Sequence, residues 1–212
     1  MPSRRRRPAT SSGRNEHPAR LGEAMKIRHA DSVRDAAGCA ALYAPFVEAT
    51  PISLEERVPT AADFAARIHR IEQTHPWLMA EDRDRVAGFA YGCPHRERAG
   101  YRWAAEVTVY VDPAFQRRGV GRALYRCLFD LLDKQGLWVA CAGIGLPNEA
   151  SVSFHESFGF VPVGVYRNIG YKLGRWWDVG WWQLSLKEPG EEAPAEPGRP
   201  VRLHPEQMPP RV

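Results

Sequence analysis

The chain has 212 residues, of which 44% are hydrophobic and 25% are charged, and its formal net charge is +4. That length fits one domain with loose ends, and the sequence has no run of about 20 apolar residues for a membrane-spanning helix and no apolar stretch after its arginine-rich start for a secretory signal. Four cysteines that are distant in sequence suit neither a metal or redox pair nor a disulfide framework, so we expect reduced thiols and a cytoplasmic protein.

The two ends differ in composition from the middle. Six arginines against two glutamates give residues 1–24 a charge of +4, which is the whole surplus, so the rest of the chain is formally neutral. A neutral body argues against a nucleic-acid-binding domain. We expect residues 1–24 to be a disordered basic extension, with Met25 as a candidate start codon. Residues 25–186 should form the folded domain, and the Pro- and Glu-rich segment 187–212 should be a disordered tail.

Helical and strand-like patterns alternate along the body. A short strand is expected from Met25, and then a helix that Asp31 caps and that runs to about Glu48. Thr60 and Asp63 have the spacing of a capping box, which predicts another helix. Strands are predicted at 77–82, 86–93, 103–111, 138–144, 160–166 and 177–186, and helices at 119–135 and 148–158, with Asn148 as the cap of the last helix. The short connections favour a mixed α/β chain with more antiparallel pairs than a doubly wound sheet.

The most informative stretch is 109–122, where a β-rich segment stops at Asp112 and Pro113 and leads directly into an amphipathic helix. Gly119 and Gly121 allow backbone to approach a ligand closely. Unpaired N–H groups in the first helical turn, together with the helix dipole, favour an anion such as a pyrophosphate. Two glycines at this spacing also occur where a helix simply begins, and neither of the familiar phosphate-loop patterns is present.

Two motifs in this region are similar to those of a known superfamily. Gln116-x-x-Gly119-x-Gly121 resembles the acetyl-CoA motif of the GCN5-related N-acetyltransferases (GNAT), and Asn148-x-x-Ser151-x-x-Phe154-His155-Glu156-x-x-Gly159-Phe160 resembles the next motif. Segments 105–111, 144–148 and 170–180 are more similar still to the phosphinothricin and methionine sulfoximine N-acetyltransferase branch. The resemblance covers nearly all of 25–186. It implies an α/β fold of the α+β type: a mixed, mostly antiparallel sheet, splayed in the middle and flanked by helices.

The resemblance also implies acetyl-CoA as co-substrate, bound without a metal in a split between the strand that ends at Val111 and the strand 138–144. Strand backbone would bind the pantetheine arm, and main-chain N–H groups of the following loop would bind the pyrophosphate. A backbone N–H near Val109 would polarise the thioester carbonyl. The implied cofactor contacts are Val109, Tyr110, Val111, Gln116, Arg117, Arg118, Gly119, Val120, Gly121, Arg122 and Asn148.

Glu106 and His155 are the candidate catalytic residues. An acceptor amine arrives protonated, so a base must remove a proton, and Glu106 can do so directly or through one water. Its alternative is a place on a solvated polar face. His155 stands where many relatives carry a tyrosine that protonates the leaving thiolate; it can also assist deprotonation or be a satisfied core histidine. Cys127 and Cys141 are interpreted as buried small hydrophobes, which favours direct transfer over an acetyl-enzyme.

The acceptor is expected near the segment 94–101. In the branch that the chain resembles, a basic-x-Arg pair here binds the anionic end of the substrate, and Arg96 and Arg98 match it; guanidinium groups suit such oxyanions. The alternative is a solvated charged loop. Tyr101 either closes the pocket or simply packs. Leu54 stands where a phosphinothricin-specialised enzyme tends to have an aromatic residue, so a broader pocket that accepts methionine sulfoximine or sulfone fits as well.

These expectations define an acetyl-CoA-dependent N-acetyltransferase for the α-amine of a small anionic amino acid or analogue. The branch is typically homodimeric, so a homodimer is expected, with no nucleic-acid or membrane partner. One rival, an RNA- or DNA-binding protein that works through Arg4–Arg7, is opposed by the neutral body of the chain, and two further rivals stand beside this reading. One is an acetyltransferase for protein N-termini or another amine, which needs an open groove. The other is a CoA-binding regulatory protein without turnover, against which the presence of both Glu106 and His155 argues.

Overall fold

The computed structural model describes residues 25–83, 85–188, 190 and 194–203. Seven strands form one sheet in the order β1-β2-β3-β4-β5-β7-β6, and each neighbouring pair is antiparallel except β4 with β5. The strands are β1 (Met25–His29), β2 (Trp77–Asp82), β3 (Arg85–Pro94), β4 (Ala104–Val111), β5 (Val139–Leu146), β6 (Val161–Lys172) and β7 (Arg175–Ser185). This mixed, mostly antiparallel sheet confirms the predicted fold class.

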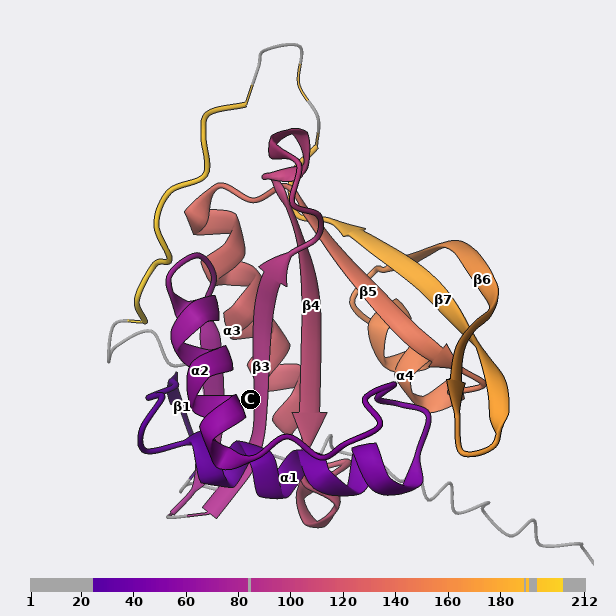
Figure 1. Ribbon diagram of the computed structural model, residues 1–212. Helices are drawn as coiled ribbons and strands as arrows, with labels where there is room; N and C mark the ends of the chain where they lie inside the picture. The colour runs from indigo at the N-terminus through magenta and orange to yellow at the C-terminus, as the bar shows by residue number, and fades with distance from the viewer. Residues whose placement is uncertain (1–24, 84, 189, 191–193, 204–212) are drawn as a thin grey trace, which may run out of the picture.

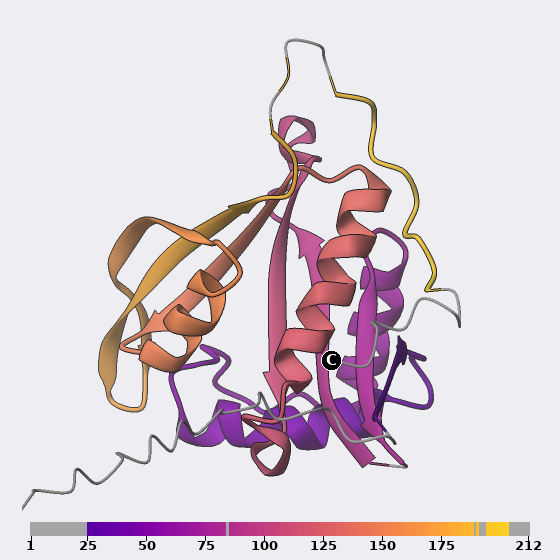
Figure 2. The same cartoon turned by 180° about the vertical axis from the view of Figure 1, so that it is seen from behind.

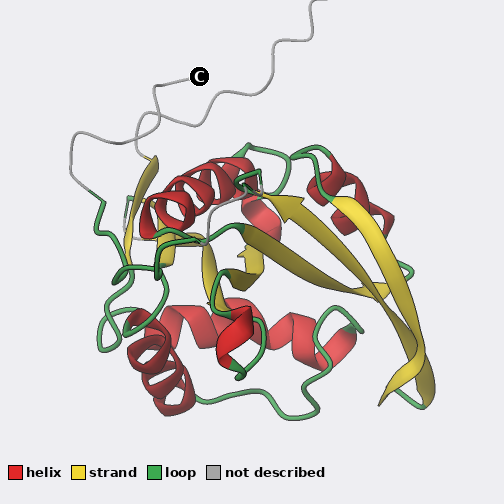
Figure 3. Ribbon diagram, turned by 90° about the horizontal axis from the view of Figure 1, so that it is seen from above, coloured by secondary structure: helices red, strands yellow, loops and turns green. Residues whose placement is uncertain are grey.

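Helices cover both faces of the sheet, as Figures 2 and 3 show. One face carries α1 (Ala36–Ala49) and α2 (Ala61–Glu72), and the other carries α3 (Val120–Gln135) and α4 (Glu149–Glu156). Two short 3-10 helices, η1 (Ala99–Tyr101) and η2 (Pro113–Phe115), flank β4. Because strand side chains alternate between faces, each face of β4 contributes to a different apolar cluster.

The predicted apolar stripe of α3 is confirmed. Leu124, Leu128, Leu131 and Leu132 have no exposed surface, and they pack against the sheet in the larger of the two core clusters. The helix ends at Gly136, whose positive φ of 95° is the left-handed conformation that glycine adopts at low cost. This packing on the sheet fixes the position of α3, and the N-terminus of the helix lies beside the end of β4.

The sheet splits between β4 and β5. These two strands are paired only over Ala104–Glu106, opposite Val139–Cys141. Beyond that point β5 continues beside β7 as far as Leu146, while the register found in the described residues gives Val107–Val111 no partner in β5. Figure 1 shows the two strands close at one end and far apart at the other. The inner edge of β4 is thus available to another extended group.

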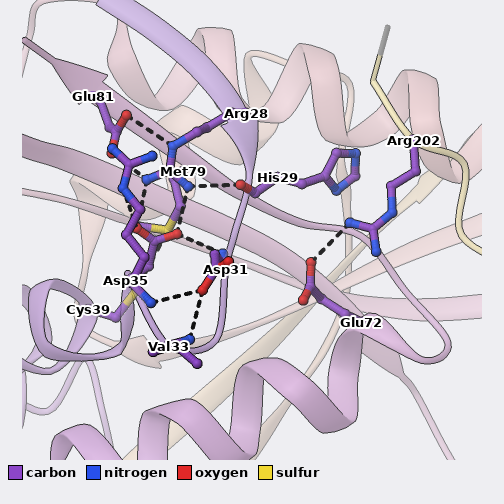
Figure 4. Close-up of polar contacts among 11 residues, drawn as sticks. Arg28, His29, Asp31, Val33, Asp35, Cys39, Glu72, Met79, Glu81 and Arg202 are labelled. Atoms are coloured by element: carbon purple, nitrogen blue, oxygen red, sulfur yellow. Dashed lines mark hydrogen bonds and ion pairs between the residues drawn. The ribbon is translucent and has the colours of Figure 1, made fainter.

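The start of α1 differs from the prediction. The Asp31 carboxylate accepts the N–H groups of Val33 and Arg34, at 2.9 and 2.8 Å, and so closes a turn instead of capping a helix. The helix begins at Ala36, after Asp35, whose carboxylate accepts two 2.6 Å bonds from Arg28 (Figure 4). The Arg28 guanidinium also pairs with Glu81, so it joins β1, β2 and the start of α1.

The other two caps follow the sequence. Thr60 and Asp63 form the predicted capping box, and the Asn148 side chain accepts the Ser151 N–H at the start of α4. The final hairpin is longer than expected, because Leu173 and Gly174, with φ values of 51° and 77°, form a two-residue turn between β6 and β7. Two shifts of register interrupt β6, one of them between Tyr166 and Gly170.

The described part of the tail, residues 194–203, has neither helix nor strand but lies against the domain. Val201 and Leu203 pack on the larger core cluster, and Arg202 pairs with Glu72 at 3.4 Å (Figure 4). Its hydrogen bonds include Trp103 Nε1 to the Ala195 carbonyl at 2.8 Å, the Gly198 N–H to the Gln135 carbonyl at 2.7 Å, and the Leu203 N–H to His29 Nε2 at 2.9 Å. The disorder predicted for the segment 187–212 stays a prediction. The expectations for 1–24 and 204–212 concern residues outside the described ones.

Candidate active site

Glu106 lies at the apex of the split. It is the last residue of β4 that is paired with β5, and Cys93 of β3 and Cys141 of β5 are its partners on either side. By strand alternation it shares a face with Tyr110, which packs in the cluster formed with α1 and α2. The side chain is 30% exposed, so the carboxylate is partly shielded yet reachable at the point where the two strands separate.

Two side chains hold the carboxylate of Glu106. His95 Nδ1 donates to Glu106 Oε1 at 3.1 Å, and Arg96 Nη1 donates to the same oxygen at 3.2 Å. The same Arg96 nitrogen also donates to the backbone carbonyl of His95 at 2.8 Å. The hydrogen bonds from His95 and Arg96 to Glu106 therefore both end on Oε1. Among the described residues no hydrogen bond involves Oε2, so this oxygen is free to accept a proton.

Aromatic rings surround these polar groups. The His95 ring meets Trp181 of β7 and Tyr101 of η1 edge to face, with centroid distances of 5.7 and 6.0 Å. The Arg96 guanidinium lies 5.7 Å from the centroid of Trp181, a cation–π distance. Trp181 also meets Tyr166 of β6 edge to face, with the ring centroids 6.2 Å apart. The candidate site is therefore a polar centre with an aromatic wall, built by β4, β6, β7, η1 and the loop that joins β3 to η1.

The four predicted substrate residues are placed differently. Tyr101 joins the wall, and Arg96 is engaged by Glu106. Arg98 precedes η1 and is exposed, and the described residues offer its side chain no ion pair. Leu54 packs on β6, where a Cβ on Gly170 would lie 2.6 Å from its Cδ1. Its loop is tied to β6 by Lys172 Nζ, which donates to the Ser53 carbonyl at 2.5 Å.

Three members of the aromatic site were not predicted: His95, Tyr166 and Trp181. His95 directly precedes Arg96, but its contact with Glu106 depends on the register of β3 with β4, in which Pro94 is opposite Ala105. That register places His95 one residue beyond the strand end. An alternation argument within 94–101 could find Arg96 and Arg98, whereas the pairing of strands that brings in His95 and Trp181 is a tertiary property.

The start of α3 has the features of an anion cradle. Gly119 is its N-cap with a φ of 83°, and in the described part of the chain no side chain caps the first turn. The N–H groups at the start of the helix thus point outward at the positive end of the dipole. Arg117, with a φ of 58°, and Arg118 are exposed in the loop before it, as is Gln116. This backbone fits the diphosphate part of a nucleotide cofactor.

Gly121 also has a packing role. A Cβ there would lie 3.3 Å from the ring of Phe154 in α4 and 3.5 Å from Val111. Arg122 strengthens the same contact: its Nη2 donates to Ser157 Oγ at 2.9 Å, and its guanidinium lies 5.1 Å from the centroid of Phe158. The start of α3 therefore packs closely on α4, and the absence of a side chain at Gly121 allows the two helices to approach.

Asn148 lies apart from Glu106, at the far end of β5. It lines a cavity of about 440 Å³ together with Leu146, Pro147, Glu149, Val152, Ser153, Arg167 and Asp178. Its side-chain oxygen already accepts the Ser151 N–H, so its amide nitrogen remains as a donor. Asn148 thus combines a cap of α4 with a polar group at the open end of the split.

His155 is buried in an aromatic layer between α3 and α4. Its Nδ1 donates to the Ser151 carbonyl at 2.8 Å, and its Nε2 accepts the hydroxyl of the fully buried Tyr125 at 3.0 Å. Burial lowers the pKa of His155, and the bond to the Ser151 carbonyl opposes that shift. Glu106 faces the α1–α2 side instead. The structure thus gives both ring nitrogens of His155 protein partners, and it records no contact between His155 and Glu106.

The cysteines have the environment of core residues. Cys127 and Cys141 are buried, and burial raises the pKa of each thiol to about 11. Burial also raises the pKa of Cys93 to about 11, and the neighbouring Glu106 adds to this shift. Thiols with such pKa values are almost fully protonated near neutral pH and are poor nucleophiles. These surroundings favour direct transfer over an acetylated cysteine.

Comparison with known proteins gives a consistent result. The acetyltransferase (GNAT) domain family matches residues 27–181. A phosphinothricin N-acetyltransferase of Streptomyces viridochromogenes is 38% identical over 177 residues, which cover 84% of this chain and 94% of the relative. An L-methionine sulfoximine/L-methionine sulfone acetyltransferase of Salmonella typhimurium is 36% identical over 165 residues, covering 77% of this chain and 96% of the relative.

A solved structure agrees with these sequence matches. The GNAT-superfamily phosphinothricin acetyltransferase of Sinorhizobium meliloti, in complex with acetyl-CoA, superposes with a TM-score of 0.76 and 28% identity. The superposition covers 87% of this chain and 98% of the other. No helix in the described parts of the chain is long and apolar enough to cross a membrane.

Proposed function

This chain belongs to the GNAT acetyltransferase family and is an N-acetyltransferase, and we propose that it acetylates the α-amine of a small anionic amino acid or analogue, of the phosphinothricin or methionine sulfoximine and sulfone type. The observation that carries the proposal is Glu106 at the apex of the β4–β5 split, with one carboxylate oxygen anchored and the other free. The relatives that act on such compounds support the substrate class.

Acetyl-CoA is the proposed co-substrate, as in the Sinorhizobium meliloti structure. The unpaired inner edge of Val107–Val111 fits the pantetheine arm, with Val109, Tyr110 and Val111 as the backbone contacts. The loop and first turn at 116–122 fit the pyrophosphate, with main-chain N–H groups as donors. Asn148 contributes an amide donor at the far end of the split. When bound there, acetyl-CoA supplies an activated acyl group as its thioester.

Glu106 is the proposed general base. Its Oε2 takes a proton from the ammonium group of the acceptor, directly or through one water, and so exposes the nitrogen lone pair for attack on the acyl carbon. The backbone N–H groups at the free edge of β4, near Val109, are placed to stabilise the negative charge that develops on the acyl oxygen. Because the Cys127 and Cys141 thiols stay protonated, the acyl group passes directly to the amine: the new C–N bond forms, the thioester C–S bond breaks, and CoA leaves as the thiolate.

His155 is assigned a positioning role. With Nδ1 bonded to Ser151 and Nε2 bonded to Tyr125, the imidazole has no free nitrogen with which to exchange a proton with the acceptor. The lowered pKa favours the neutral ring, in which Nε2 accepts the Tyr125 hydroxyl. His155 therefore holds α4 against α3. Because Asn148 is the cap of α4, this contact also positions Asn148 at the split.

Arg98, Tyr101 and Leu54 are proposed to select the acceptor. Arg98 is exposed, and its backbone carbonyl accepts the N–H of Tyr101, a member of the aromatic wall, at 2.9 Å, so we assign Arg98 the anionic end of the substrate. Tyr101 forms part of that wall, and Leu54 limits the pocket from the side of β6. An aliphatic residue at position 54 leaves room for the flexible side chain of a methionine derivative, which supports a broader amino-acid pocket.

A homodimer is also proposed. β6 is an edge strand of the sheet, and with the start of β7 it exposes a row of large apolar side chains: Val161, Val163, Ile169, Tyr171 and Trp176 are each more than half exposed. An apolar row of this kind on a sheet edge is typically covered by a partner. A second copy of the chain can cover this face. The cytoplasmic location remains a prediction.

The proposal is tested by following CoA release from acetyl-CoA with a panel of amines. The panel contains phosphinothricin, methionine sulfoximine, methionine sulfone, the common amino acids and a peptide with a free N-terminus. We expect turnover with the small anionic amino acids or their analogues, and much less with the peptide. Turnover with the peptide alone would indicate an acetyltransferase for protein N-termini. Binding of acetyl-CoA without any turnover would indicate a regulatory protein.

A further inference from the structure

We propose that His95 is a positioning residue for the base Glu106, and that the two form a His–Glu dyad in which the imidazole orients the carboxylate toward the acceptor amine. This inference rests on the proposed function, since it assigns a partner to the base of that reaction. Its first support is the contact itself, 3.1 Å between His95 Nδ1 and Glu106 Oε1. A carboxylate only accepts hydrogen bonds, so the imidazole nitrogen is the donor.

The position of the imidazole is fixed by packing. The His95 ring meets two other rings, Trp181 and Tyr101, edge to face, and the His95 side chain is 17% exposed. Its backbone carbonyl accepts a 2.8 Å bond from Arg96. A histidine ring that packs against two aromatic rings, in a residue whose backbone carbonyl is hydrogen-bonded, has few alternative rotamers. It can therefore keep a hydrogen-bonded carboxylate in one orientation, which an exposed surface histidine cannot do.

The division of the two carboxylate oxygens gives the dyad its function. His95 and Arg96 both donate to Oε1, which leaves Oε2 as the oxygen that takes the proton of the acceptor. The proton moves from the ammonium nitrogen to Oε2, and the pair of electrons that held it stays on nitrogen for attack on the acyl carbon. No proton need leave His95, so its role is orientation.

The other groups near the dyad do not supply this role. Cys93 and Cys141 lie opposite Glu106 on the neighbouring strands, and their thiols are protonated and weak donors. Tyr101 meets His95 through its ring. Arg96 is the other cationic group at Glu106; it is 45% exposed and carries a long flexible side chain, so it contributes charge more than orientation.

The test compares His95→Asn with His95→Leu. Asn keeps an N–H donor at the δ position, whereas Leu has a similar shape and no donor. We expect His95→Leu to lower kcat about 10-fold with little change in the KM for acetyl-CoA, and His95→Asn to stay within about 3-fold of wild type. His69→Leu, at an exposed histidine on α2, is the matched control for removal of an imidazole and should leave kcat unchanged. Equal rates for the Leu variant and wild type would overturn the dyad.

A double-mutant cycle separates orientation of the base from a general effect on folding. If His95 acts through Glu106, adding His95→Leu to Glu106→Gln should change kcat by less than about 2-fold. If the two losses multiply, His95 does not act through Glu106 and the proposal is wrong. Thermal unfolding of each variant, compared with wild type, shows whether the aromatic wall is intact.

A second readout does not depend on turnover. In protein labelled with ¹⁵N-histidine, the imidazole of His95, assigned by its loss in His95→Asn, should show a protonated Nδ1. Its signal should shift in Glu106→Gln. A His95 signal that is the same in Glu106→Gln and in wild type would overturn the dyad even in an active enzyme. If no amine is acetylated but this coupling is present, the proposed function fails while the His95–Glu106 contact stands.

Discussion

Arg96 and Arg98 are two residues apart and have different surroundings. Arg96 donates to Glu106 and lies on Trp181, whereas Arg98 is exposed at the start of η1. We expect Arg98→Ala to raise the KM for anionic amino acids about 10-fold or more, because a hydrogen bond between charged groups contributes about 1.5–3 kcal/mol. Arg96→Ala should act mainly on kcat, since it removes a hydrogen-bond partner of Glu106, the proposed base. Steady-state kinetics with both variants measures the two effects.

A neutral amine is the control for this pair. If Arg98→Ala impairs a neutral acceptor as much as an anionic one, Arg98 does not bind the anionic end. Sequence alone suggested both arginines for the substrate, because residues two apart in an extended segment point the same way. The structure separates them through the strand register that brings Glu106 against Arg96.

The Tyr125–His155 contact makes a prediction about stability. Tyr125→Phe leaves Nε2 of the buried His155 without its donor, and an unpaired buried polar group costs about 1–3 kcal/mol. Denaturant unfolding should show a loss of this size. At saturating acetyl-CoA, kcat should change far less than in a Glu106 variant. A large fall in kcat with unchanged unfolding would instead make His155 part of the proton transfer.

Local sequence signals located most of the elements. The capping box at Thr60, the cap at Asn148 and the apolar stripe of α3 depend on residues within one or two turns, and all three are confirmed. The start of α1 was misplaced because the Asp31 carboxylate closes a turn with the N–H groups of Val33 and Arg34 instead of capping a helix. The β6–β7 hairpin was underestimated because β6 contains two shifts of register, which interrupt its alternation of side chains.

The segment 194–203 gives a prediction that depends on pH. The Leu203 N–H needs an unprotonated His29 Nε2, and burial, together with Arg202, lowers the pKa of His29 to about 4. The folded pKa is below the ordinary value of 6.5, so the contact is fully available above pH 6.5 and is lost as the pH falls through 4. Glu72, the partner of Arg202, also loses its charge on acidification, and burial raises its pKa.

Truncation before residue 194 measures this contact. At pH 7 we expect the full chain to unfold a few degrees above the truncated one, since about 1–2 kcal/mol corresponds to about 2–8 °C at this length. The difference should shrink toward pH 4. In His29→Gln, whose amide oxygen accepts without titrating, it should shrink less. A difference in Tm that is equal at pH 7 and pH 4 would show that His29 does not anchor the segment.

The exposed row on β6 makes a prediction about the whole molecule. Wild type should sediment with twice the chain mass of 23.9 kDa, and Val163→Glu should shift it toward the monomer because it places a charge in the apolar row. Val33→Glu is the matched control, since Val33 is 89% exposed in the loop before α1. A monomeric wild type, or a Val163 variant with unchanged mass, would contradict the proposed interface.

The fold class and the position of Glu106 could be reached from the sequence because the resemblance to the GNAT family covers nearly all of the domain. The composition of the site could not. His95 directly follows β3 and Trp181 belongs to β7; these two strands are not adjacent in the sheet, and the two residues meet only once β4 and β5 lie between the strands. The role of His155 likewise depends on Tyr125 in another helix. Such assignments require the packing of the molecule.

The central claim is that Glu106 removes the proton of an amine beside acetyl-CoA bound in the split. The most direct measurement compares Glu106→Gln with wild type in two assays: kcat with the best acceptor of the panel, and the Kd of acetyl-CoA by calorimetry. The account predicts a fall in kcat of about 100-fold or more, with a Kd within about 2-fold of wild type. A kcat within about 3-fold of wild type, or the absence of any heat of acetyl-CoA binding to the wild-type protein, would contradict it.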